Sequence, residues 1–118
     1  VEVLQVVRGE SLTLGRARLD ILNPSRHPAE EVNANSVAFV LNYNNVPRAL
    51  LMGDMPIENE AEIALPDVDI VMAGHHGSKG STSDALLRAT SPKYVVFSYG
   101  RNNYGHPNDG LIERVRAI

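Results

Sequence analysis

Short apolar runs, rich in β-branched and aromatic residues, fill the first half of the chain, and residues typical of turns separate them. Such runs favour strands over helices, because branched and aromatic side chains pack well on a pleated surface. Glycines at positions 9 and 15 mark turns between the first runs, and Asn44-Asn45 marks a hairpin turn between the last two. The pattern predicts a surface loop at 23–33 and strands over residues 3–7, 11–14, 17–22, 36–43 and 48–52.

Helical and strand patterns alternate in the second half of the chain. Acidic residues gather early in the first helical pattern, which Pro66 ends, and Ser and Thr caps open the second. A helix that joins two strands usually sets them parallel, so we expect a layered α/β arrangement with helices outside a sheet. The predicted helices are 57–65, 81–90 and 108 onward, and the predicted strands are 69–73 and 93–98.

The size and composition of the chain suit one domain or part of one, with 118 residues of which 43% are hydrophobic. No apolar run approaches the roughly 18 residues of a membrane helix, and no basic segment opens a signal peptide. Because the chain begins at Val1, we expect a segment of a longer protein, with residues 1–118 in a single domain. Cysteine is absent, so any metal must be held by His, Asp, Glu or Asn.

The net charge of −3 is unevenly distributed, with acidic residues in excess before position 75 and basic residues in excess after it. Local positive charge suits a phosphate-bearing substrate, although scattered solvated charges explain it equally well. The chain contains no glycine-rich phosphate loop, serine nucleophile elbow or zinc-ribbon spacing, which excludes those classes of site.

Residues with metal-binding or catalytic chemistry follow three successive predicted strands. They are Gly53-Asp54, the His75–Ser78 segment, and a loop that contains His106. Layered α/β folds build their sites at such strand ends. A carboxylate is a plausible metal ligand there, and neutral imidazole is the commonest one. In extended backbone, adjacent side chains point to opposite sides, so one of the two adjacent histidines is free to act on a substrate while the other binds metal.

Each of these residues also has a purely structural interpretation, and the residues alone do not decide between a functional and a structural role. Asp54 suits a helix cap or a turn, the two adjacent histidines suit a structural role, and His106 before Pro107 suits the entry to the last helix. The other polar candidates are turn, cap or solvent-exposed residues by default, and they are Asn33, Asn35, Ser36, Asn102, Asn103 and His27.

Taken together, four stretches resemble the second half of the metallo-β-lactamase-like domain of the ComEC family of DNA-uptake proteins. They are residues 33–41, 49–65, 67–87 and 91–107, so the resemblance covers essentially the whole chain. It implies an α/β (α+β) fold, the metallo-β-lactamase-like αββα sandwich, of which this chain is the C-terminal half. It also implies one or two zinc or manganese ions at the edge of the sheets, and no small organic cofactor.

The resemblance assigns roles residue by residue. It makes Asp54, His75 and His76 metal ligands, with Asp54 in the bridging position. Asparagines at 33 and 35 lie where many relatives carry a ligand histidine, which implies a weaker or single-metal site. The signature His-x-Asp-x-Asp-His is absent, so we expect the chain alone to be inactive as a nuclease. The implied catalytic residues are His106, Asn35, Ser78 and Asn103.

The implied activity is phosphodiester hydrolysis that degrades the DNA strand not imported through a membrane channel. The partners are then DNA, as a single strand, and the channel part of the same protein. The implied location is a soluble domain of a bacterial inner-membrane protein, on the extracytoplasmic face. Three alternatives stay open: a catalytically inert DNA guide, a small-molecule hydrolase of the same fold, and a structural module.

Overall fold

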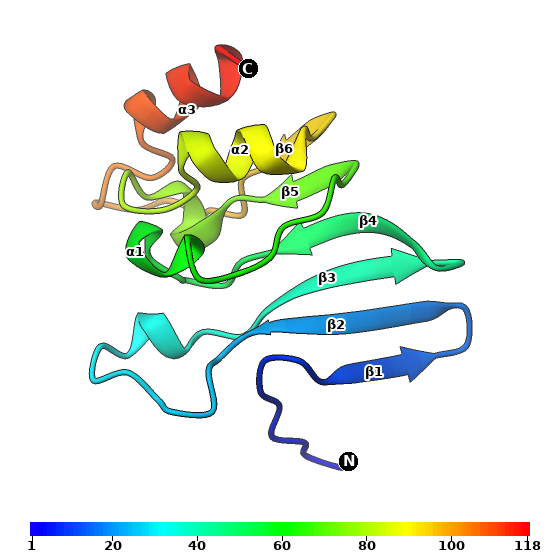
Figure 1. The fold of residues 1–118 in the computed structure, drawn as a ribbon. Coiled ribbons are helices and arrows are strands. Elements are labelled where there is room, and N and C mark those ends of the chain that lie inside the picture. The colour runs from blue at the N-terminus through cyan, green and yellow to red at the C-terminus, as the bar shows by residue number, and fades with distance from the viewer.

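The computed structural model describes residues 1–118 and contains a six-stranded mixed sheet whose strands lie in the order of the sequence (Figure 1). The first four strands pair antiparallel, whereas β4, β5 and β6 pair parallel. The parallel pairing of the last two strands confirms what the helix between them predicts. The strands are β1 (Ser11–Leu14), β2 (Ala17–Asn23), β3 (Ala38–Tyr43), β4 (Val46–Leu51), β5 (Ile70–Met72) and β6 (Tyr94–Val96).

Three α-helices and two short 3-10 helices connect the strands. The side chain of Ser83 caps α2 by accepting a hydrogen bond from the Leu86 amide, and Asn108 caps α3 by accepting one from the Gly110 amide. None of the helices has both the length and the apolar character that crossing a membrane requires. The helices are α1 (Ile57–Glu60), α2 (Asp84–Thr90) and α3 (Asp109–Arg116), with η1 (Asn33–Asn35) and η2 (Gly74–Gly77).

Two predicted elements differ in the structure. The segment 3–7 forms no strand, because it pairs with no neighbouring strand and its first residues lie exposed in solvent. The first helix ends at Glu60 rather than at Leu65. Beyond it, burial alternates along the chain, with Ile63 and Leu65 packed against the core and the residues beside Ile63 exposed. The chain turns at residues 61–63 and forms no further helix, so core packing overrides the helical pattern.

The hydrophobic core lies on one face of the sheet. Cross-strand pairing places Val40, Leu50, Val71 and Val95 side by side across four strands. The first three of these side chains are buried, and Leu86 and Leu87 of α2 pack in the same cluster. The sheet face that α2 covers is therefore a closed apolar layer, of the kind that packs a helix on a sheet.

The opposite face of the sheet, called the open face below, is apolar and uncovered. One row of paired residues crosses all six strands and a second crosses five, and apart from Ile21 of β2 none of their side chains is buried. Ile70 of β5 is 38% exposed, and Tyr94 of the edge strand β6 is 67% exposed. The rows are Leu12, Leu19, Leu41, Ala49, Ile70 and Tyr94, then Ile21, Phe39, Leu51, Met72 and Val96.

Candidate functional site at the strand ends

The two adjacent histidines lie in η2, directly after β5. Their backbones adopt left-handed conformations, with φ of 47° at His75 and 55° at His76. The expectation of extended backbone is therefore wrong, because η2 turns the chain tightly here. Non-glycine residues hold such angles only when their surroundings over-determine them, and this strain clusters at functional sites. Here the His75 amide donates to the Gly53 carbonyl at 2.8 Å, which ties η2 to the end of β4.

The His76 ring is oriented by a backbone carbonyl. Its Nδ1 lies 2.8 Å from the oxygen of Ser98, just after β6. A carbonyl oxygen only accepts hydrogen bonds, so Nδ1 carries a proton, and in the neutral form of the ring the lone pair lies at Nε2. That Nε2 lies 3.7 Å from Oδ1 of Asp54. The predicted proximity of Asp54 to one of the two histidines is confirmed, while their roles as metal ligands stay predictions.

The loop of Asp54 is fixed from the segment before β3. The Asp54 amide donates to Oγ of Ser36 at 3.1 Å. Gly53 has φ of 56°, and a Cβ there would lie 3.0 Å from Cβ of Ser36. Glycine is therefore required for both the backbone angle and the close approach. Ser36 thus positions the carboxylate loop, a role that its sequence pattern, typical of a loop cap, does not reveal.

The loop after β6 folds back so that His106 faces His75. The two ring centroids lie 5.7 Å apart in an edge arrangement. Asn102 holds this loop: its Oδ1 accepts from the amides of Tyr104 and His106, and its Nδ2 donates to the carbonyls of Gly100 and His106. The turn former Asn102 is thus the organiser of the loop.

The other three predicted catalytic residues make only local contacts. Oγ of Ser78 accepts from the Gly80 amide, and the Asn35 amide group bonds the backbone of Ala29 and Glu31 in the surface loop. Asn103 is exposed and its side chain makes no hydrogen bond within the chain. Their catalytic roles stay predictions, and the structure connects Asn35 to the loop rather than to Asp54.

The pair of donors at Asp54 and His76 fits part of a metal site. Two ligands of one tetrahedral ion, each about 2.1 Å from it, lie about 3.4 Å apart, close to the observed separation. A backbone acceptor on the second ring nitrogen is the usual support of a metal-binding histidine. However, no group of three or more His, Asp or Glu side chains comes together closely enough to hold an ion. Within this chain, Asp54 and His76 therefore match two coordination positions of a metal ion.

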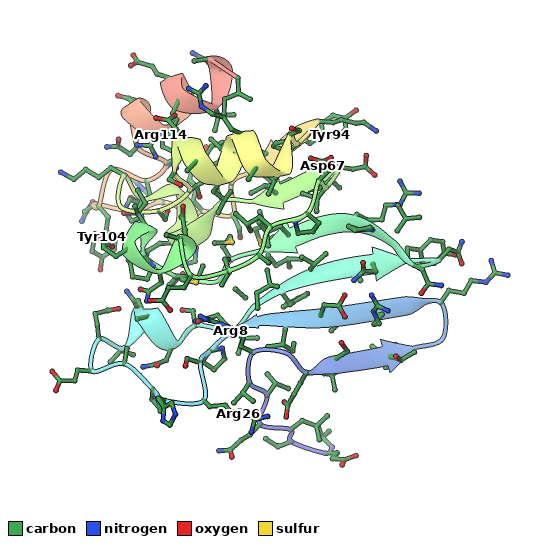
Figure 2. The ribbon with its side chains drawn as sticks, viewed as in Figure 1. Arg8, Arg26, Asp67, Tyr94, Tyr104 and Arg114 are labelled. Carbon is green, nitrogen blue, oxygen red and sulfur yellow. The ribbon has the colours of Figure 1, made fainter.

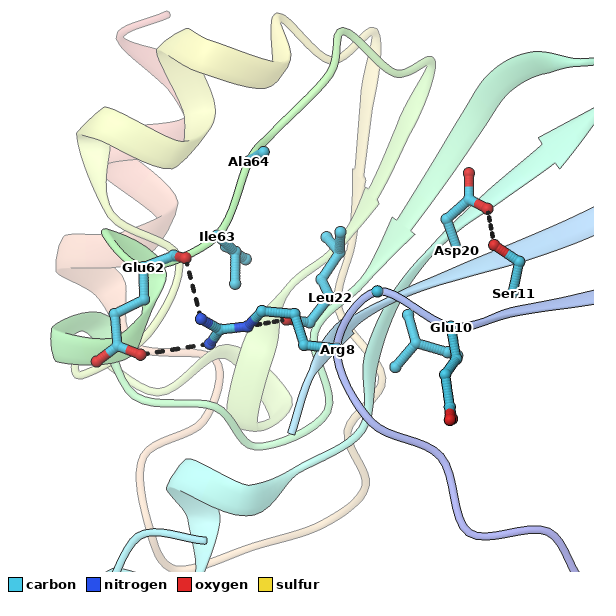
Figure 3. A pocket seen from close by; sticks show the side chains of 10 residues that line it. Arg8, Glu10, Ser11, Asp20, Leu22, Glu62, Ile63 and Ala64 are labelled. Carbon is cyan, nitrogen blue, oxygen red and sulfur yellow. Dashed lines mark hydrogen bonds and ion pairs between the residues drawn. The ribbon is translucent and has the colours of Figure 1, made fainter. Parts of the chain in front are cut away.

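A separate pocket of about 390 Å³ lies beside Arg8 and the C-terminal half of β2 (Figure 3). Its charges satisfy one another, since Arg8 pairs with Glu62 at 3.3 Å and Ser11 donates to Asp20 at 2.7 Å. Partial burial raises the pKa of Asp20, but hydrogen bonds from Ser11, Arg18 and Asn42, with the charge of Arg18, hold it below its ordinary value. These pairings give this pocket a structural role.

The fold and these strand ends define a mixed α/β domain segment with an Asp-His cluster at the carboxyl edge of its parallel strands. No protein-family model matches the chain. It is 30% identical over 118 aligned positions to ComE operon protein 3 of Bacillus subtilis strain 168, covering 96% of this chain and 15% of the relative. It is 34% identical over 98 positions to Recombination protein 2 of Haemophilus influenzae Rd, covering 80% of this chain and 12% of the relative.

A third relative, competence protein ComA of Neisseria gonorrhoeae, is 47% identical over 49 positions, which cover 41% of this chain and 7% of that protein. These relatives indicate that the chain is related to competence proteins of the ComEC type, at modest identity. The chain spans at most 15% of the length of these relatives, so it corresponds to one small part of them.

Proposed function

We propose that the chain is part of a metal-dependent phosphodiesterase domain of a competence protein that takes up DNA. The observation that carries the proposal is the His76 ring, which the Ser98 carbonyl turns so that Nε2 faces the Asp54 carboxylate at 3.7 Å. Two lone-pair donors that face each other at this distance favour a cation between them. His106 lies beside this pair, across the ring of His75.

The open face supports the assignment to one half of an αββα metallo-β-lactamase-like sandwich. An apolar row that spans all six strands and remains unburied is larger than the scattered apolar residues of an ordinary protein surface. A second sheet packed about 10 Å away would bury it, as in other sheet-on-sheet folds. The second sheet, together with further metal ligands, lies in this proposal outside these 118 residues.

The proposed cofactor is one or two zinc or manganese ions, held by Asp54 and His76 with His75 beside them. An ion bound there would supply positive charge to stabilise the phosphoryl oxygens as negative charge develops. Among the residues of the chain, the Ser98 carbonyl keeps the proton on Nδ1 of His76, and Asn102 holds the backbone of His106 in place. As a water oxygen bonds to phosphorus and the bond to the leaving oxygen breaks, His106 gives that leaving oxygen a proton. Ser78, Asn35 and Asn103 are further candidates for contacts to the substrate.

The proposed substrate is DNA, with degradation of the strand that is not imported. Support comes from the relatives, one of which is named a competence protein and another a recombination protein. Exposed basic residues near the site, Lys79 and Arg101, suit a polyanion. In this proposal the domain lies beside the membrane channel part of the same protein, on the extracytoplasmic face of a bacterial inner membrane.

The test compares metal content and DNA hydrolysis in variants of the full-length protein. Asp54→Asn and His76→Gln should lower metal affinity by roughly 10- to 100-fold and hydrolysis by roughly 100-fold or more. The matched controls are Asp67→Asn, at an exposed residue before the start of β5 (Figure 2), and His27→Gln, at an exposed residue of the surface loop, and neither should alter metal affinity or hydrolysis. Wild-type metal content together with wild-type hydrolysis in both site variants would overturn the proposal.

A catalytically inert DNA guide is the second candidate, and one observation favours it. The amide group of Asn35, which lies where many relatives are expected to carry a ligand, is engaged by the backbone of its own loop. With no third ligand at hand, the site within this chain remains a two-donor pair. A full-length protein that binds DNA but retains no metal and cleaves no strand would establish the guide.

A further inference from the structure

A small cavity opens beside the Asp-His cluster, between the loop after β6 and the rings of His76 and His106. It has a volume of about 210 Å³ and is lined by residues of the 99–104 loop together with His76 and His106. That volume lies below the roughly 300–1,000 Å³ typical of pockets for drug-sized ligands. The cavity therefore suits one planar group, such as a single nucleobase, and not a base pair.

Two tyrosines of this loop are exposed without a structural reason. Tyr99 is 59% exposed and Tyr104 is 84% exposed, and neither hydroxyl makes a hydrogen bond within the chain. The nearest aromatic neighbour of Tyr104 is the His106 ring, at 5.9 Å and tilted by 34°. Exposed tyrosine rings that project beside a site are the usual platforms on which single-stranded nucleic acids stack their bases.

The loop is held in shape before any ligand arrives. Asn102 makes four hydrogen bonds to backbone groups of Gly100, Tyr104 and His106. A loop fixed in this way loses little conformational freedom on binding, which favours affinity. Three of these bonds link the position of Tyr104 to that of His106.

The charge of the cavity suits a phosphate. Arg101 lines it and is exposed, and this side chain forms no ion pair within the chain. No carboxylate lines the cavity, in contrast to the pocket beside Arg8, where Glu10, Asp20 and Glu62 are present. A guanidinium without a partner can bind a phosphate through two parallel hydrogen bonds.

We propose that Tyr99, Tyr104 and Arg101 form a nucleotide subsite, in which the tyrosines stack an unpaired base and Arg101 binds its phosphate. The inference rests on the proposed function, since it names the substrate of that site as single-stranded nucleic acid. The subsite places the neighbouring phosphodiester beside His106 and His76. A duplex is excluded from it, because its bases are stacked on one another and offer no free face.

The test measures binding of a labelled single-stranded pentanucleotide to the full-length protein by fluorescence anisotropy, with EDTA present so that hydrolysis does not interfere. Tyr99→Ala and Tyr104→Ala should each raise Kd by roughly 5- to 100-fold, whereas the Phe variants, which keep the ring, should bind like the wild type. Arg101→Ala should weaken binding, and the slope of the logarithm of affinity against the logarithm of salt concentration should become shallower by about 1, the contribution of one phosphate contact. Duplex binding should not change in the tyrosine variants.

An affinity of the double Tyr→Ala variant within about twofold of the wild type would overturn the subsite, as would equal losses for single strand and duplex. The two proposals can fail separately. If Asp54→Asn leaves hydrolysis intact while the tyrosine variants lose the single strand, the metal proposal is wrong and the subsite stands. If Asp54→Asn abolishes hydrolysis while the tyrosine variants keep their affinity, only the subsite is wrong.

Discussion

Gly77 packs η2 closely against the end of the His106 loop, so replacing it by alanine tests whether the two segments lie together as described. A Cβ at this position would lie 2.8 Å from Cδ1 of Phe97 and 2.8 Å from Cβ of Pro107. It would also lie 3.1 Å from Cα of Pro107, which is backbone and cannot swing aside. The residue has φ of 88°, a conformation that alanine rarely adopts.

Two terms therefore add in Gly77→Ala. The left-handed backbone costs about 1 kcal/mol or somewhat more for alanine. Overpacking against Phe97 and Pro107 adds roughly 1–3 kcal/mol. We expect a total loss of about 2–4 kcal/mol in the free energy of unfolding of the chain.

The assay is urea unfolding followed by circular dichroism, with Gly9→Ala as the matched control. Gly9 has a similar φ of 91°, and a Cβ there would meet nothing within 4 Å. The control therefore carries only the backbone term, about 1 kcal/mol, and the difference between the variants isolates the steric term. Equal midpoints for the two variants would show that η2 does not pack against the His106 loop, which refutes the described site.

Three further predictions follow from single contacts. Asn102→Ala removes hydrogen bonds that hold the His106 loop and should lower the free energy of unfolding, measured in urea, by about 1–2 kcal/mol. The control Asn103→Ala should lower it clearly less, and equal losses would contradict the role of Asn102. The pKa of Asp20 in the folded chain lies below its ordinary value of 3.8, so its ionised form adds stability above that value, and this stability is lost as the pH falls through the folded pKa. Asp20→Asn should therefore weaken the pH dependence of the free energy of unfolding between about pH 5 and 2. An unchanged acid profile would contradict the stabilising role of ionised Asp20. His106→Ala in the full-length protein should leave folding intact and lower DNA hydrolysis by roughly 100-fold or more, and wild-type turnover would remove His106 from the site.

Local sequence pattern was sufficient for most of the sheet, because its turns and strand ends depend on near neighbours. Asn44 and Asn45 both have positive φ, as a tight hairpin turn requires, and the pattern places the turn correctly. The early end of α1 at Glu60 depends instead on a contact distant in sequence. The Glu60 carboxylate is buried and accepts the amides of Thr82 and Ser83, 22 and 23 residues away. No window of local sequence contains that contact.

The candidate site likewise has features that local sequence predicts and features that depend on distant contacts. Strand order brings Asp54, His76 and His106 to one edge, and the sequence pattern is enough to predict that gathering. It cannot distinguish Asn102 from Asn103, which are the same residue type side by side. Only the path of the backbone decides that the first turns inward to bind four backbone groups and the second faces solvent.

The strained histidine pair explains why the three loops form one site. The His75 amide is bonded to the carbonyl of Gly53 after β4, and Nδ1 of His76 to the carbonyl of Ser98 after β6. The Gly77 carbonyl accepts the Asn108 amide at 2.9 Å, which ties the start of α3 to the same turn. Since the left-handed angles of η2 persist only while these neighbours hold them, the orientation of His76 toward Asp54 depends on all three connections. The chemistry of the site is therefore a property of the assembled sheet edge and not of the histidine motif alone.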